Sequence, residues 1–154
     1  MDMERDSACH WQALWFPPNT AERAHVGRLE ERMKITDPGA MHPAWAECFN
    51  RQDFDGMAGF MDTNAVFAPQ PGLALTGEDN LAAQRQFLAM GLPIDLTVRH
   101  VLREGDIALA IVDWTIKGTA ADGNEVDLKG TAADVLRLGD QGWKLIIDNP
   151  FGTA

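Results

Sequence analysis

The chain has 154 residues, which is enough for one domain with a substantial core and too few for two comfortable domains. A hydrophobic fraction of 45% is typical of globular proteins, whereas a formal net charge of -10 would repel phosphate backbones and anionic lipid surfaces. Neither a nucleic acid nor a membrane is therefore expected as a partner.

Targeting and redox signals are sparse. No stretch approaches the roughly 18 consecutive apolar residues of a membrane span, and the N-terminus lacks a basic region followed by an apolar run. We therefore expect a soluble, cytoplasmic protein. Cys9 and Cys48 lie in unlike contexts, so two reduced thiols are the simpler interpretation, although the sequence also permits a disulfide.

Residues 1–35 differ in character from the rest and are predicted to form a partly helical N-terminal extension. The aromatic stretch HWQALWFPP precedes Asn19, which can cap a helix that runs to about Lys34 with a thin apolar stripe. The segment is interpreted as a surface extension or as an arm that packs its aromatic side chains on a partner subunit. Met33 is also a candidate translation start, which leaves open whether the extension belongs to the working protein.

From Asp37 onward the patterns are regular. Apolar residues at spacings of three and four predict helices, and Pro or Gly clusters predict where they end. The predicted elements are a helix from Pro38 to Asn50, a helix capped by Asp53, a short strand over 65–68 and a helix from Gly77 to Gly91.

The last third of the chain is predicted to form strands over 96–103, 107–117, 126–138 and 143–149, joined by short turns that require antiparallel neighbours. The second strand is apolar on both faces, which predicts a central strand covered on both sides. Because the chain has no further element to cover its outer side, we expect a homodimer that associates through the sheet face.

Asp134 is the one polar residue on an otherwise apolar strand face that includes Ala132 and Leu136. Without a cationic partner, burial would favour its protonated form, and it would donate a hydrogen bond or act as a general acid. The alternative is a structural aspartate that bonds to a neighbouring side chain.

The order of elements resembles the SnoaL-like and ketosteroid-isomerase-like superfamily, also called nuclear-transport-factor-two-like. The resemblance rests on WAECFNRQDFDGMAGFMDTNAVFAPQPG, GDIALAIVDWTIKG, GTAADVLRL and GWKLIIDNP, and defines a domain over 36–154. It implies an α+β fold in which a cone-shaped, curved antiparallel sheet wraps around N-terminal helices and encloses a cavity. Relatives include isomerases, dehydratases, cyclases, epoxide hydrolases and non-catalytic modules, so the resemblance specifies fold better than function.

Ketosteroid isomerases in this superfamily use a carboxylate base, a tyrosine donor and a neutral carboxylic acid. The resemblance places the acid at Asp134, the tyrosine at Trp45 and the base at or beside Pro69. Because only the acid is kept, the familiar steroid isomerase arrangement is not expected.

His100 shares a predicted strand face with Leu96 and Val98 and is the candidate base, although a lone histidine on an apolar face is more often structural. At the end of the last strand, either Asp148 or Asn149 points inward. The residues expected to contact a flat, hydrophobic, neutral ligand are Trp45, Phe49, Phe60, Phe67, Trp114 and Asn149.

Two functions fit these patterns. One is a cofactor-independent isomerase, dehydratase or cyclase that moves protons on a hydrophobic carbonyl or polyketide-like substrate, with Asp134 and His100 as its catalytic residues. The other is a non-catalytic small-molecule-binding or dimerisation module. The sequence contains no HExxH, CxxC, GxSxG or P-loop motif, so we expect neither a metal nor a nucleotide cofactor.

Overall fold

The computed structural model describes residues 21, 24 and 34–152. The fold described below is that of the unit Met33–Ala154. The predicted extension, with its aromatic stretch and most of its helix, lies outside the described residues.

Aspartate side chains cap two of the helical elements, and Asp53 does so as predicted. The side chain of Asp37 accepts a hydrogen bond from the backbone N–H of Gly39 at 3.0 Å, and that of Asp53 accepts one from Gly56 at 2.9 Å. Within residues 34–152, no helix has the length and apolar character that a membrane span requires. The helical elements are η1 (Pro38–Ala40), α2 (Met41–Asn50), α3 (Phe54–Gly59) and α4 (Gly77–Leu88).

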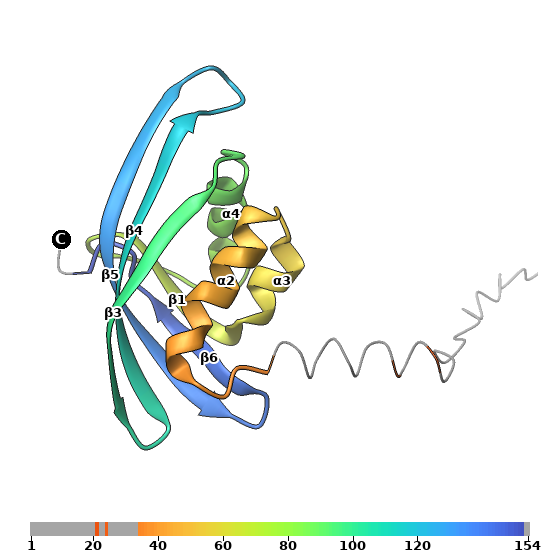
Figure 1. Ribbon diagram of the computed structural model, residues 1–154, viewed down its shortest axis with the longest axis vertical. Coiled ribbons are helices and arrows are strands. Elements are labelled where there is room, and N and C mark those ends of the chain that lie inside the picture. Colours follow the sequence, from red (N-terminus) through yellow and green to blue (C-terminus); the bar gives the residue numbers. More distant parts are fainter. Residues whose placement is uncertain (1–20, 22–23, 25–33, 153–154) are drawn as a thin grey trace, which may run out of the picture. The chain divides into compact units, whose positions relative to one another are not determined.

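One mixed six-stranded sheet curves around the helices (Figure 1). Its order is β2-β1-β6-β5-β4-β3, and every pairing is antiparallel except that between β1 and β6. The predicted α+β cone is confirmed, with this parallel pairing as the departure from a purely antiparallel sheet. It can arise because β1 and β6 are far apart in the chain, so no tight hairpin constrains their direction. The strands are β1 (Met61–Gln70), β2 (Leu73–Leu75), β3 (Ile94–Glu104), β4 (Ile107–Thr119), β5 (Glu125–Gly139) and β6 (Gly142–Asp148).

The core lies between the helices and the inner face of the sheet. Alternate residues of β4 from Ala108 to Ile116 are buried there, as the period of a strand requires. The intervening residues of β4 are half-buried or exposed on the outer face, so the cover predicted for that face is not supplied by the described residues. Cys48 is a buried free thiol, whereas Cys9 lies outside the described residues.

Candidate functional site

A cavity of about 70 Å³ lies between helices α2 and α4 and the inner face of the sheet. Most of its wall is aliphatic and aromatic, and its titratable wall residues come from three different elements. These residues are His42 on α2, Asp134 on β5 and Asp148 at the end of β6.

Asp134 is buried, as its strand face predicts, and both of its carboxyl oxygens are engaged. Oδ2 lies 2.6 Å from Nε2 of His42, and Oδ1 accepts a hydrogen bond of 2.7 Å from the backbone N–H of Asn149. Both oxygens of Asp134 therefore have partners within the protein, which corresponds to the structural alternative considered for this residue from the sequence.

Asp148 has the character that the sequence suggested for Asp134. Burial, together with the nearby charge of Asp134, raises the pKa of Asp148 to about 8. Its Oδ2 accepts a hydrogen bond of 2.7 Å from Nε2 of Gln84, a buried residue of α4. At neutral pH, Asp148 is thus a protonated acid that lines an apolar cavity.

Two polar atoms on α2 lack a hydrogen-bond partner among the described residues. They are Nδ1 of His42 and Nε1 of Trp45, both buried and belonging to residues that line the cavity. If Nε2–H of His42 donates to Asp134, then Nδ1 carries a lone pair, whereas the indole N–H of Trp45 can only donate. Because a buried polar atom without a partner is costly, the pair suits a ligand oxygen that both donates and accepts.

The aromatic wall of the cavity agrees in part with the sequence-based prediction. Trp45, Phe49, Phe67 and Trp114 all line the cavity, and the rings of the first two lie 5.3 Å apart. Phe60 is buried in the core but is not part of the wall.

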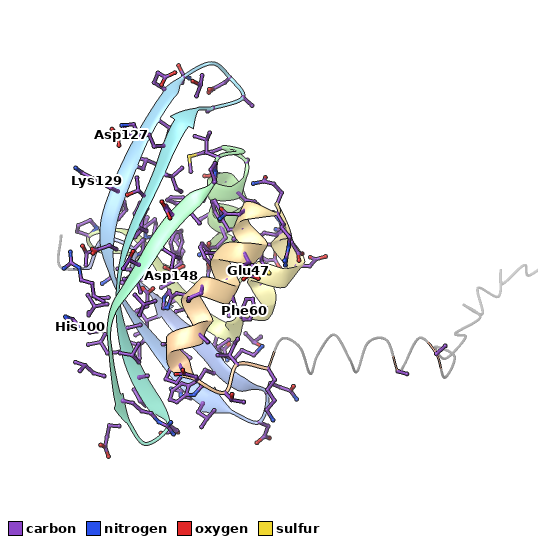
Figure 2. The ribbon with its side chains drawn as sticks, in the orientation of Figure 1. Glu47, Phe60, His100, Asp127, Lys129 and Asp148 are labelled. Atoms are coloured by element: carbon purple, nitrogen blue, oxygen red, sulfur yellow. The ribbon has the colours of Figure 1, made fainter. Side chains whose placement is uncertain are left out.

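His100 lies on the outer face of the sheet, so the prediction that it belongs to the core is wrong. Val98 pairs with Val112 and His100 pairs with Ile111, which leaves one extra residue in β3 between the two pairs. Such a β-bulge reverses which alternate residues face the core. His100 is exposed and does not line the cavity, and Figure 2 shows it on the side of the sheet away from the helices.

The end of β6 carries a second irregularity. The pairing between β5 and β6 shifts at Val135 and Leu136, so simple alternation along β6 misassigns its last residues. Asp148 points inward (Figure 2), whereas the side-chain amide of Asn149 donates to the carbonyl of Gly152 at 2.7 Å. Asn149 does not line the cavity, and its contribution to the site is its backbone N–H on Asp134.

Sequence reasoning missed His42, although a signal was present. His42 precedes Trp45 by three residues and Phe49 by seven, which places the three side chains on one face of α2. A histidine at that spacing on a helix whose apolar face covers the sheet is a candidate for contact with a buried acid on the sheet.

Asp113 on β4 has structural partners on both neighbouring strands. It forms an ion pair with Arg99 on the neighbouring strand and accepts a hydrogen bond of 2.7 Å from the hydroxyl of Thr131. These bonds hold the pKa of Asp113 below its usual value. No group of three or more His, Cys, Asp or Glu side chains within the described part of the chain is placed to hold a metal ion.

The sequence profile of the SnoaL-like domain family matches residues 43–146. A search of curated proteins gives no match.

Several solved structures share the fold. A ketosteroid isomerase-like protein from Erwinia carotovora atroseptica has 21% identity and a TM-score of 0.60, with 71% of this chain and 88% of that one covered. A candidate dehydratase of the NTF2-like family from Streptomyces avermitilis has 20% identity and a TM-score of 0.62, covering 75% and 94%. A candidate calcium/calmodulin-dependent protein kinase type II association domain from Thiobacillus denitrificans has 17% identity and a TM-score of 0.63, covering 78% and 98%. At these identities the similarity shows the fold alone.

Proposed function

Because the chain belongs to the SnoaL-like domain family, we propose that it is a cofactor-independent enzyme that moves protons on a small, neutral, apolar carbonyl compound. The observation that carries this proposal is the buried His42–Asp134 pair, which lines the same apolar cavity as the protonated Asp148. Such chemistry needs one group that takes a proton and one group that donates a proton, and here these groups are His42 and Asp148.

In the proposed reaction, Nδ1 of His42 takes a proton from the carbon beside the carbonyl group. The C–H bond breaks, an N–H bond forms, and the electron pair moves onto the carbonyl oxygen to give an enol or enolate. Asp134 fixes the orientation of the imidazole ring and stabilises its charged form. Asp148 and the indole N–H of Trp45 donate hydrogen bonds to the developing oxyanion.

The next proton transfer decides the outcome. Return of the proton from His42 to a different carbon is an isomerisation. If the carbon beyond the enol carries a hydroxyl group, its C–O bond breaks as the carbonyl group re-forms and a C=C bond is made, and the proton on His42 joins the departing hydroxide to give water, which is a dehydration. A neutral substrate is favoured because a substrate carboxylate would enter an apolar cavity next to the acid pair Asp134 and Asp148, where a further negative charge is costly.

Exchange of carbon-bound hydrogen for deuterium tests the proposal directly. The probe is phenylacetone in deuterated buffer, with loss of its α-proton signals followed by nuclear magnetic resonance. The wild type is expected to accelerate the exchange over buffer, and His42→Gln is expected to abolish the acceleration. His100→Gln serves as the matched histidine control and should retain it. No acceleration by the wild type would contradict the proposal.

A second function is favoured by the outer face of the sheet. Leu102, Leu109, Val135 and Ile147 pair in sequence across four strands and form one apolar row, which is named here the outer row. Leu102 is 62% exposed and Ile147 is 39% exposed. Exposed apolar surface of this kind is typical of association sites, and one structural neighbour is described as an association domain. A second copy of this chain, packed on the outer row, would supply the cover predicted for the sheet.

Sedimentation equilibrium tests the association separately from the chemistry. The wild type is expected to have twice the mass of one chain, and Leu102→Asp is expected to have the mass of one. Leu128→Asp, which changes a 37% exposed leucine outside the outer row, is the control and should keep the wild-type mass. A monomeric wild type would exclude a homodimer through this face.

A further inference from the structure

A second space adjoins the cavity. It is a groove of about 370 Å³ between α4 and the β1–β2 hairpin, and Leu128 of β5 also lines it. Its wall is almost wholly apolar and includes Pro69, Leu75 and Met90. The groove is thus larger than the cavity of about 70 Å³ and has none of its titratable residues.

Phe67 and Phe87 belong to the walls of both spaces. Their rings meet edge to face, with centroids 6.0 Å apart and planes at 80°. Phe67 is 2% exposed on β1, whereas Phe87 is half-buried on α4. The two rings therefore form the wall that the cavity and the groove share.

The titratable side chains line only the cavity, and the groove offers exposed apolar side chains. His42, Asp134 and Asp148 are all on the cavity side of the shared wall, whereas the groove side exposes large apolar side chains. Leu73 is 38% exposed and Leu128 is 37% exposed at the groove. Covering such surface with an apolar group is favourable roughly in proportion to the area removed from water.

We propose that the groove binds the apolar tail of the same ligand whose oxygen-bearing head occupies the cavity. This inference rests on the proposed function of the cavity and adds the class of substrate, a small carbonyl or hydroxyl head joined to an alkyl or flat apolar tail. Phe87 is the residue that selects the tail, since its side chain stands between the two spaces. The shared wall argues for this occupant, because a ligand that fills the cavity already contacts both phenylalanine rings.

Calorimetric titration of the full-length chain with a series of 4-alkylphenols tests the inference. Phenol probes the cavity alone, and the ethyl, butyl and hexyl derivatives add a tail. In the wild type, affinity is expected to rise about fourfold for each methylene group that enters the groove. The double variant Leu73→Asp, Leu128→Asp should keep the affinity for phenol and lose the gain with chain length. Ile107→Asp changes a 36% exposed residue outside both spaces and should keep the gain.

A second variant addresses the shared wall. Phe87→Ala removes one of the two rings of the shared wall, and it is expected to shift the preference from 4-butylphenol toward the branched 4-tert-butylphenol. Thermal unfolding of each variant shows whether the fold is retained. The double variant is expected to retain it because the two substituted leucines are more than one-third exposed.

The other outcomes distinguish failure of the groove inference from failure of the proposed function. If phenol binds and longer tails add no affinity in the wild type, the groove inference is wrong and the proposed function of the cavity stands. If phenol itself does not bind, the groove inference and the proposed function both fail. If the double variant changes the sedimentation mass and leaves the gain with chain length intact, the groove is a surface for a second copy, and the tail assignment is overturned.

Discussion

His42 and Asp134 are 92 residues apart in the chain, yet Nε2 of His42 lies 2.6 Å from Oδ2 of Asp134. This contact joins α2 to the inner face of β5. It also fixes one ring nitrogen of His42 on the carboxyl group and leaves the other without a partner among the described residues. A histidine held in this way has the arrangement required of a general base.

Removing the carboxyl group of Asp134 is expected to destabilise the domain strongly. Asp134→Ala leaves both Nε2 of His42 and the backbone N–H of Asn149 without their buried acceptor, so a loss of about 3 kcal/mol in the free energy of unfolding is expected. Urea denaturation measures it. Asp113→Ala, which breaks the ion pair with Arg99 on the outer face, is the control and should change the stability much less. Equal losses of unfolding free energy in Asp134→Ala and Asp113→Ala would show that burial of the His42–Asp134 contact contributes little to stability.

The pKa of Asp148 predicts how stability depends on pH. This pKa is about 4 in an unfolded chain and is raised to about 8 in the folded domain. Between these values the folded state binds more protons than the unfolded state, so this group makes the free energy of unfolding fall as pH rises through that window. Asp148→Asn removes the titration. Its stability relative to the wild type should therefore increase from pH 4 to pH 8, and parallel curves would refute the assignment.

The same proton controls ligand binding. Above a pH of about 8, Asp148 ionises and can no longer donate to a ligand oxygen, so the affinity for phenol is expected to fall. Calorimetry at a series of pH values measures the decline. In Asp148→Asn, whose amide cannot ionise, the decline should be absent.

Gly130 makes room for the cavity wall. A Cβ atom at this position would lie 2.7 Å from the carbonyl oxygen of Pro150 and 2.8 Å from Nε1 of Trp114, the two atoms that form a hydrogen bond of 2.6 Å. Gly130→Ala should therefore displace the indole ring, cost about 1–3 kcal/mol in stability and weaken phenol binding. Gly139→Ala, on the same strand with no atom within 4 Å of its Cβ, is the matched control. If Gly130→Ala and Gly139→Ala have the same stability and the same affinity for phenol, close packing at Gly130 has no role in shaping the cavity wall.

The indole N–H of Trp45 is expected to contact the ligand oxygen. Trp45→Phe keeps an aromatic ring in the cavity and removes the donor, so phenol affinity should fall about fivefold. Trp143→Phe provides a matched comparison, because Nε1 of Trp143 also lacks a partner among the described residues while Trp143 is not part of the cavity wall. An unchanged affinity in Trp45→Phe would remove this residue from the site.

Much of the fold could be predicted from local patterns because these patterns reflect local physics. Asp53 caps a helix since its side chain reaches the first free N–H groups, and alternation correctly places Asp134 on the buried face of β5. The assignments failed where alternation is interrupted. The bulge before His100 and the shifted pairing that precedes Asn149 depend on how two strands align. The alternation of apolar and polar residues within one strand gives no information about that alignment.

The candidate site itself depends on contacts between distant segments. The sequence shows that Asp134 faces inward, but it does not show that His42 reaches it across the core. The partners of the two buried acids differ as well. Asp134 lies 2.6 Å from Nε2 of His42 and accepts a hydrogen bond from the backbone N–H of Asn149, whereas Asp148 accepts one from Gln84 and lies near the charge of Asp134, which helps to raise its pKa.

Nitrogen chemical shifts of His42 test the central claim most directly. In protein labelled with ¹⁵N-histidine, Nε2 is expected to be the protonated nitrogen on Asp134. Addition of phenol should shift the Nδ1 resonance as it accepts a hydrogen bond, whereas the resonances of the exposed His100 should stay in place. A His42 spectrum that does not change while calorimetry reports phenol binding, or a proton found on Nδ1 instead of Nε2, would contradict the account.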